Sequence, residues 1–510
     1  MPVEHTWGVP EYFARLYDTE EKRDQIPSLN TLPPEQWQPG TLVRFRCMVQ
    51  DTSFGQEIAI DAARTADGQS WRAYRYADGA PHAADDASLG ADALYAGQDR
   101  VRLNELQLLY CVSVPGETAW ARHEYSEKMA PRWGYDPTAP AGSTPGHATK
   151  LAAKHPLEEE GARSCGVVVL GSIDDIRVTD VVEFIGVYGT TPVMSDDLMS
   201  DSHAADTMDH SPCVHAICHR ILHAATETPL YAPESFGREG HLVAGDIKPY
   251  DVAAESRQSL LDSFTRLLQG DALAAEYMLL ALISRVQHRV NATTVGNLTL
   301  NLTRLQPSEL AKRVERHLAD LVTKCVTLPM SLACLNHRPF WPRDTGSSVE
   351  KLASGRLQLS AGTCLLVDET ALDEGKLEDT GVRNVRALAR VVEAQQLDYA
   401  FPYRGEISFP TDVTLLIFST ARSMLPAEFV LPLQLGTMAT NDDDGHATDA
   451  DVHRQWRAYL ALMRAMPHVI PETLSQRIQQ DFVDRRRADT EQGRPVMSDA
   501  ALSYELLVAR

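Results

Sequence analysis

The chain has 510 residues, enough for about three domains at the usual domain size. It carries 48 Lys and Arg against 70 Asp and Glu, a net charge of −22. This balance argues against a dominant nucleic-acid surface, because affinity for DNA comes mainly from neutralising phosphates with cationic side chains, although a local basic patch is compatible with it. With 44% hydrophobic and 23% charged residues, the sequence is typical of a folded globular protein.

The sequence predicts neither a membrane span nor a secretory signal. No apolar stretch approaches the roughly 18 uninterrupted residues that a spanning helix needs. The N-terminus lacks the basic and then apolar pattern of an exported protein. Most of the eight cysteines lie in apolar runs, as Cys47, Cys111, Cys325 and Cys364 do. This is typical of reduced core cysteines and favours the cytosol or nucleus.

The first part of the chain predicts short strands. Residues 1–40 are expected to form a helix or loop segment that precedes the first strand. In residues 41–50, Val43, Phe45, Cys47 and Val49 alternate with more polar residues, which predicts one buried face. Further strands are expected at 106–114, 165–170 and 181–189. Residues 121–163 are rich in Pro, Gly, Ala, Ser and Thr and are predicted to be an exposed linker or insertion. Residues 41–230 therefore predict an interrupted OB-like β-barrel.

From about residue 250 the hydrophobic period changes from 2 to 3.6. Buried strands at 298–302, 364–367 and 413–418 alternate with helices, which predicts a parallel α/β sheet over 245–440. After the acidic stretch 441–451, residues 450–510 are expected to form a helical lid, with helices at 452–466, 471–487 and 498–510. The fold class predicted is α+β multidomain.

Two polar pairs end neighbouring buried strands. Asp368-Glu369 follows the strand at 364–367 and is similar to a Walker B pair, in which Asp holds Mg²⁺ and Glu polarises the attacking water. Ser419-Thr420 follows the strand at 413–418, where a sensor strand would lie. A strand that ends in Asp-Glu is more often a turn or a cap, so the pair alone does not predict hydrolysis.

The phosphate loop that such a site needs is absent. The motif G-x-x-x-x-G-K-[ST] should join the strand and helix within 297–322. The connection there, residues 303–308, contains neither glycine nor lysine, and Lys312 is expected one turn inside the helix. Pro307 also removes a main-chain donor. We therefore predict no catalytic residue and no cofactor, and interpret Asp368, Glu369, Ser419 and Thr420 as vestigial.

A second cluster combines histidine and cysteine between residues 210 and 223. Zinc ligands could come from four of its side chains: Cys213, His215, Cys218 and His219. Their spacing does not match a zinc-finger pattern, and the apolar residues between them suit a strand or helix that enters a core. We predict no metal site and keep zinc binding as the weaker alternative.

Several segments together resemble the minichromosome maintenance complex-binding protein family, in the right order over nearly the whole chain. The segments that carry the resemblance are 27–30 (PSLN), 45–51 (FRCMVQD), 110–120 (YCVSVPGETAW), 270–277 (GDALAAEY), 366–370 (LVDET) and 381–388 (GVRNVRAL). The resemblance implies a degenerate AAA+-like domain that lacks its P-loop, with the helical lid at 456–487. It further implies a nuclear, non-catalytic partner of the hexameric replicative helicase that acts in assembling or unloading the ring and in sister-chromatid cohesion.

The sequence departs from this pattern in places. No Ser-Arg-Phe segment follows Thr420, where helicase subunits carry an arginine finger, and residues 121–163 contain no basic import signal. The family usually continues past the segment that matches 506–510, so part of the lid is expected to be missing. Our leading hypothesis is an adaptor or chaperone of helicase subunits, associated with chromatin only indirectly. The rivals are a nucleotide hydrolase with an unorthodox phosphate site and a protein that binds single-stranded DNA through the β-barrel. The sequence leaves open the subunit contacted, the contact surface and the oligomeric state.

Overall fold

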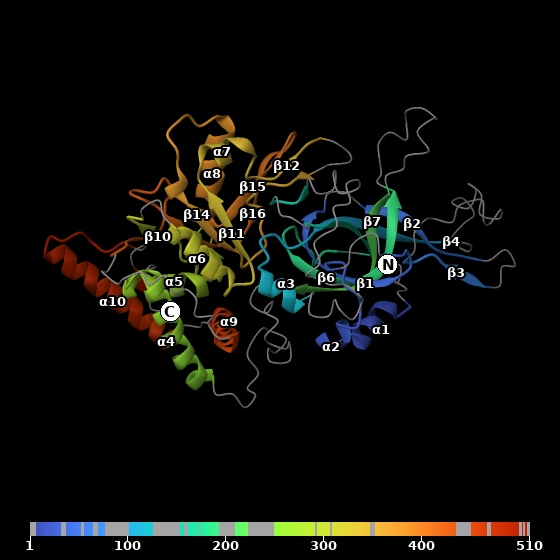
Figure 1. The fold of residues 1–510 in the computed structure, drawn as a ribbon, viewed down its shortest axis with the longest axis horizontal. Helices are drawn as coiled ribbons and strands as arrows, with labels where there is room; N and C mark the ends of the chain where they lie inside the picture. Colours follow the sequence, from blue (N-terminus) through green and yellow to red (C-terminus); the bar gives the residue numbers. More distant parts are fainter. Residues whose placement is uncertain are drawn as a thin grey trace.

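The computed structural model has a mixed α/β fold with several sheets (Figure 1). In Figure 1 strands β1 to β7 lie together on the right above α1 (Val9–Leu16) and α2 (Glu20–Arg23), a parallel sheet with its helices lies on the left, and α3 (Ala119–Tyr125) lies between them. The residues described are 7–31, 37–52, 56–64, 70–76, 101–125, 154–157, 162–171, 173–192, 210–222, 249–290, 293–305, 309–346, 352–434, 450–466, 471–498, 502 and 505–506.

Five strands of the first part close into a ring. They are β1 (Leu42–Asp51), β4 (Val101–Val112), β5 (Ser164–Leu170), β6 (Val181–Pro192) and β7 (His210–Leu222). The ring runs β1-β6-β7-β5-β4 and returns to β1. Strands β5 and β7 pair in parallel, and the other four contacts are antiparallel. β2 (Gln56–Arg64) and β3 (Trp71–Ala73) extend the sheet from β4. Inward-facing residues of the ring, such as Phe45, Val167 and Phe184, form one core.

Strand β1 is buried on both faces, so the prediction of a single buried face was wrong. Arg44 and Arg46, which alternate with the apolar positions, are 3% and 4% exposed. Residues near α2 cover them: the Arg44 side chain pairs with Asp24 at 2.9 Å, and Leu29 N donates to the Arg44 carbonyl. Arg46 pairs with Glu117 at the edge of the ring. The arginines that alternate with the apolar residues of β1 therefore form a buried layer of ion pairs.

The expected linker 121–163 contains ordered structure at both ends, which corrects its description as exposed. Residues 121–125 belong to α3, and Lys154 and His155 are 6% and 2% exposed. Arg338 donates to the His155 carbonyl at 3.1 Å, so a residue far along the chain holds this segment in place. Residues 126–153 and 158–161 lie outside the described residues, as do the acidic stretches at 195–209 and 441–449.

The second part is built on a sheet of five parallel strands. They are β10 (Leu300–Thr303), β11 (Cys325–Pro329), β14 (Cys364–Asp368), β17 (Thr414–Phe418) and β18 (Phe429–Pro432), in the order β11-β14-β17-β10-β18. The sequence predicted a parallel sheet and three of these strands, but not β11 or β18. Successive residues of β14 enter different cores, Leu366 on one side and Leu365 on the other. Burial on both faces explains why these strands are continuously apolar.

Helices cover both faces of the parallel sheet. The core that contains Leu366 includes residues of α4 (Pro249–Leu267), α5 (Ala272–Ile283), α6 (Glu309–Ala319) and α9 (Ala450–Ala465). The opposite core includes residues of α7 (Leu332–His337) and α8 (Asp379–Ala394). On α9, Trp456 and Tyr459 are buried, whereas α10 (Glu472–Glu491) buries no residue among those described. The helix expected at 498–510 falls mostly outside the described residues.

Smaller elements complete the second part. β12 (Arg343–Asp344), β13 (Leu352–Ala353), β15 (Gln396–Phe401) and β16 (Gly405–Pro410) form a four-stranded sheet, and β8 (His288–Val290) pairs with β9 (Thr293–Val295). A 3₁₀ turn, η7 (Glu369–Ala371), follows β14. Across the described part of the chain, no helix has the length and apolar character to span a membrane.

Gly116 offers a test of how tightly the two parts are packed. It has φ +70°, and a Cβ there would overlap the Val326 Cγ2 atom of β11. We expect Gly116→Ala to lower the free energy of unfolding by about 1–3 kcal/mol more than Gly346→Ala, because Gly346 has φ +72° but nothing within 4 Å. Urea unfolding of both variants measures the difference; equal losses would mean that the contact with Val326 is loose.

Candidate functional site

The sheet brings the predicted polar residues to one edge. Asp368 at the end of β14 is in register with Phe418 of β17, and Phe418 is in register with Leu302 of β10. Because these strands are parallel neighbours, Asp368, Ser419 and the segment after β10 all follow the carboxyl ends of adjacent strands. Ligands of open parallel α/β sheets bind at this edge. The sequence analysis had placed Ser419 on a strand neighbouring that of Asp368 because the two strands are similar to a Walker B strand and a sensor strand.

Both carboxylates at this edge shape the local turn. Asp368 Oδ1 accepts from the Thr370 N–H at 2.9 Å and from the Thr370 hydroxyl at 2.6 Å, and so caps η7. Glu369 is 7% exposed and accepts from the Ser423 hydroxyl at 2.8 Å and the Met424 N–H at 3.2 Å. Burial raises the pKa of the Glu369 carboxyl, and the hydrogen bond from Ser423 partly opposes this. Asp368 therefore shapes the turn after β14, and Glu369 holds that turn to the segment after β17.

The described start of the connection after β10 packs against the protein. Ser419 N donates to the Leu302 carbonyl at 3.0 Å, and Leu305 N donates to the Ser419 carbonyl at 3.1 Å. The Leu305 side chain is 4% exposed and belongs to the core under α6. The Ser419 hydroxyl donates within the protein, to Asn301 Oδ1 at 2.9 Å or the Ala421 carbonyl at 3.1 Å, whereas Thr420 is exposed. Residues 306–308 lie outside the described residues.

The four alternative zinc ligands lie on β7 and face different surroundings. The Cys213 sulfur lies near Gly166 of β5, and Cys213 is 1% exposed. His219 contacts Asp175 at 3.0 Å, and its ring lies 6.0 Å from that of Phe184. Adjacent strand residues point to opposite faces, which separates Cys218 from His219. Within the described residues, no group of three or more His, Cys, Asp or Glu side chains is arranged to hold a metal ion.

A main-chain ladder joins the ring to the parallel sheet. Cys325 N at the start of β11 donates to the Gly116 carbonyl at 2.8 Å, and Thr118 N donates to the Thr323 carbonyl at 3.0 Å. The Thr118 hydroxyl and the Trp120 indole both donate to the Val322 carbonyl, at 2.9 and 3.0 Å. The segment that follows β4 therefore makes an isolated antiparallel bridge, Glu117 with Lys324, at the edge of the second part's sheet.

A buried polar cluster makes a second junction. The Gln50 and Gln358 side chains are completely buried: Gln50 donates to the Leu352 carbonyl at 3.1 Å, and Gln358 donates to the Gln50 carbonyl at 2.8 Å. Asp51 is 1% exposed, accepts from Leu352 N at 3.2 Å and lies 3.6 Å from the Lys154 ammonium. We name Gln50, Asp51, Lys154 and Gln358 the junction cluster.

Sequence reasoning missed the junction cluster. Its members come from the end of a strand, from an expected linker and from a loop, about 300 residues apart at the extremes. Gln50 and Asp51 end a strand whose polar positions are all buried, but this burial is visible only in the structure. The sequence does not show which residues contact Gln50 and Asp51, so it could not locate the interface.

Comparison with known proteins shows which family the chain belongs to. The model of a family described as mini-chromosome maintenance replisome factor matches residues 13–142 and 134–510. The chain belongs to this family. Proteins named mini-chromosome maintenance complex-binding protein are similar to it over most of their length. The Arabidopsis thaliana protein is 29% identical, with 96% of this chain and 86% of the relative aligned. The Gallus gallus protein is 29% identical over 98% and 89%, and the Homo sapiens protein 28% over 94% and 86%.

Membership of the mini-chromosome maintenance replisome factor family confirms the resemblance drawn from the sequence segments. The match covers the residues of both the strand ring and the parallel sheet. The family description is that of a replisome factor, and the relatives are named as binding proteins.

We expect Glu369→Gln to change how stability depends on pH. The native pKa of Glu369 is raised above its ordinary value of 4.5, so the folded state keeps a proton that the unfolded state releases. Stability contributed by this group is therefore lost as pH rises from about 4.5 through the raised pKa. Replacing the carboxyl with an amide should remove that loss. Urea unfolding at several pH values, with the exposed Glu393→Gln as control, checks this; parallel pH profiles for wild type and Glu369→Gln would contradict it.

Removing the cation of the junction cluster should be costly. Lys154→Met leaves the buried Asp51 carboxylate without its ion pair and is expected to lower the free energy of unfolding by about 3–5 kcal/mol. Asp51→Asn in the same chain should recover part of the loss, since no charge then remains buried. Lys22→Met removes an exposed pair with Asp18 and serves as control. A loss no larger than the control's, measured by urea unfolding, would mean that the pair does not stabilise the junction.

Proposed function

We propose that this chain is a non-catalytic binding partner of minichromosome maintenance helicase subunits and acts in assembling, chaperoning or unloading that complex during DNA replication. The observation that carries the proposal is its family membership, together with relatives named as complex-binding proteins along nearly the whole chain. The relatives align over 86% or more of their own length, so the proposal concerns the same whole architecture.

The carboxyl edge of the parallel sheet supports a role without catalysis. Hydrolysis of a nucleotide needs donors that cradle the phosphates and a carboxylate that is available to Mg²⁺ or water. Here Asp368 caps a turn, Glu369 binds Ser423 and Met424, and the Leu305 side chain packs into the core. These side chains serve the fold, and a binding role uses the resulting surface without nucleotide chemistry.

The strand orders support the finer fold assignment that we propose for both parts. Numbered along the chain, the ring strands run 1-2-3-5-4-1 with strands 3 and 5 parallel, as in an OB-like barrel. The parallel sheet runs 5-1-4-3-2 by the same numbering, the order of an AAA+-like domain. In that scheme β14 carries the Walker B position and β17 the sensor position. We propose an OB-like barrel followed by a degenerate AAA+-like domain, with α9 and α10 as its lid.

A helicase-like shape without its chemistry suggests how the chain acts. Each nucleotide site of a ring of ATPase subunits is built by two neighbours, so a look-alike subunit adds an inert interface. Such an interface weakens the closed ring and favours its opening. The chain is then nuclear, is associated with chromatin through the helicase, and contributes indirectly to sister-chromatid cohesion.

Binding measurements separate this proposal from a nucleotide hydrolase. We expect the purified chain to retain at least one helicase subunit in a pull-down, and Asp368→Ala to retain it equally. Isothermal titration with Mg-ATP should give no binding heat at millimolar nucleotide. Retention of no subunit contradicts the proposal, and micromolar binding of Mg-ATP that Asp368→Ala abolishes supports the hydrolase instead.

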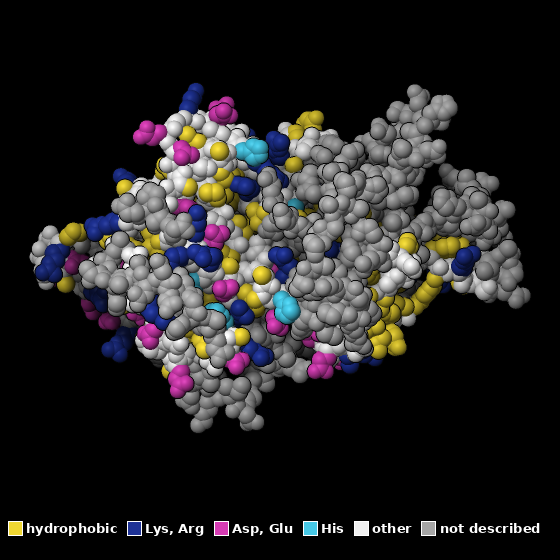
Figure 2. All heavy atoms as spheres, in the orientation of Figure 1, with side chains coloured by type: hydrophobic (Ala, Val, Ile, Leu, Met, Phe, Trp, Pro, Cys, Tyr) yellow, Lys and Arg dark blue, Asp and Glu magenta, His cyan; other side chains and the backbone are white. Residues whose placement is uncertain are grey.

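Single-stranded DNA binding by the ring is a second candidate, favoured by one cluster on β2–β4. The guanidinium groups of Arg64 and Arg102 lie 5.3 and 4.6 Å from the centre of the Trp71 ring, a combination of cation and aromatic surface that suits stacked bases. The net charge of −22 opposes it. On the face drawn in Figure 2, the described Lys and Arg side chains are interspersed with Asp and Glu. An anisotropy titration with single-stranded DNA at low salt tests this second candidate, and a flat titration would exclude it.

A further inference from the structure

Strand β11 is at the edge of the parallel sheet, and only part of that edge is paired. In a parallel ladder, alternate residues direct both main-chain groups to the same neighbour. Cys364 N donates to the Lys324 carbonyl and Met330 N to the Asp368 carbonyl, so even-numbered residues of β11 face β14. Cys325 faces outward and donates to Gly116. Thr327 also faces outward, and no described residue bonds to its main-chain N–H or carbonyl. Pro329, which has no N–H, occupies the next outward position, as prolines of edge strands do.

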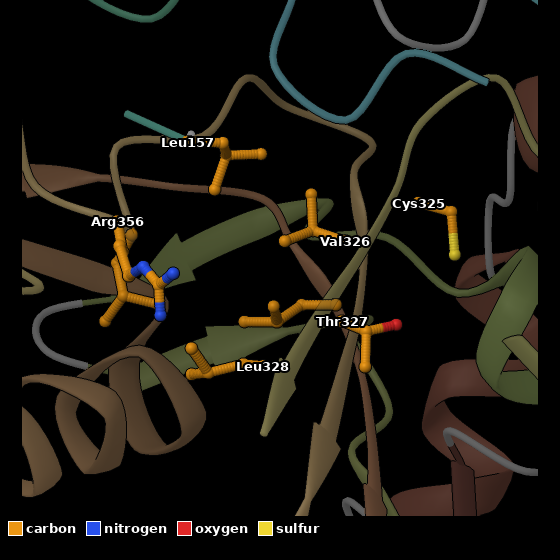
Figure 3. Close-up of a pocket in the computed structure, with 8 residues that line it drawn as sticks. Leu157, Cys325, Val326, Thr327, Leu328 and Arg356 are labelled. Carbon is orange, nitrogen blue, oxygen red and sulfur yellow. The ribbon is translucent and has the colours of Figure 1, made fainter. Parts of the chain in front are cut away.

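A cavity of about 300 Å³ lies beside this unpaired edge (Figure 3). Four consecutive residues of β11, 325–328, line it together with Leu157, Arg356, Leu357 and Leu365. Figure 3 shows Val326 and Leu328 on the side of β11 where Leu157 and Arg356 lie, with Cys325 and Thr327 on the other side. The Thr327 hydroxyl is buried and has no hydrogen-bond partner among the described residues. Among the described residues, the site therefore combines unpaired main-chain groups of Thr327, an apolar cavity and a hydroxyl without a hydrogen-bond partner.

Arg356 gives the cavity a positive charge. It is the only charged residue that lines the cavity within the described part of the chain. Its guanidinium donates to the Cys334 sulfur at 2.7 Å, and no ion pair joins it to a described carboxylate. An occupant with a carboxylate would complete this side chain with a charge-assisted hydrogen bond.

We propose that the β11 edge is a docking site for an extended peptide of another protein, which adds a strand beside Thr327 and places an acidic side chain against Arg356. The ladder formed by residues 116–118 already pairs with the start of β11, and the peptide continues the same edge. Addition of a strand to an exposed sheet edge draws affinity from main-chain bonds and specificity from pockets for alternate side chains. An apolar side chain of the peptide fills the hollow between Leu157 and Leu328. This inference is independent of which protein the chain binds.

Selection from a random peptide library tests the site. A phage-displayed library of random peptides is panned on the full chain, and the tightest peptide is synthesised and measured by fluorescence anisotropy. We expect a peptide with an acidic residue, bound about tenfold more weakly by Arg356→Gln but equally by the exposed control Arg266→Gln. Arg356→Glu should recover binding of a peptide in which Lys replaces the acidic residue. Failure to select a peptide, or equal affinity for wild type and Arg356→Gln, would overturn the proposal.

Chemical changes in the peptide test the ladder without altering the fold of the protein. N-methylation of peptide residues whose N–H faces β11 should weaken binding about tenfold, while methylation of the alternate residues should leave it within about twofold. Equal effects at both sets would overturn a strand-like mode. Self-association of the chain that the peptide abolishes would make a second copy the occupant and would also overturn the proposal.

Discussion

The junction between the strand ring and the parallel sheet is the constraint on which the rest of the structure depends. It is polar and buried: Gln358 donates to the Gln50 carbonyl, Gln50 donates to the Leu352 carbonyl, and Asp51 lies near Lys154 and accepts from the Leu352 amide. Apolar surfaces can slide past one another at small cost, whereas buried polar groups lose their partners when displaced. The junction cluster, with the ladder at Gly116 and Thr118, therefore fixes one relative placement of the two parts.

The fixed placement of the two parts determines which edges of the parallel sheet are covered. Its carboxyl edge is closed by the bonds of Glu369 to Ser423 and Met424 and by the packing of Leu305. Among the described residues, its outer edge is unpaired only beyond Cys325, where the ladder from the ring ends. The ring thus limits the length of edge strand that a partner can reach. The ring therefore decides which main-chain groups of this edge remain unpaired among the described residues.

Much of the fold could be predicted from residue periodicity. The buried strands ending at Asp368 and Phe418 were found because both faces of a covered parallel strand are apolar, and the helices because their stripes repeat at 3.6 residues. The burial of Arg44 and Arg46 was not predicted, since charge normally indicates a solvated face and only the ion pairs with Asp24 and Glu117 reverse that. The burial of Lys154 was not predicted for the same reason, and this residue also lies in a segment whose composition is typical of a linker.

For the candidate sites, too, the placement of residues could be predicted, whereas their contacts could not. The placement of Asp368 and Ser419 at one edge follows from strand order, which local patterns reveal. What the side chains do there depends on contacts with Thr370, Ser423 and Asn301, which no local pattern contains. Thr327, whose main-chain groups no described residue pairs, could be predicted even less, because this requires knowing both that β11 is an edge and where the neighbouring ladder ends. A sequence motif thus located the carboxyl edge of the sheet, whereas the outer edge of the same sheet is visible only in the three-dimensional structure.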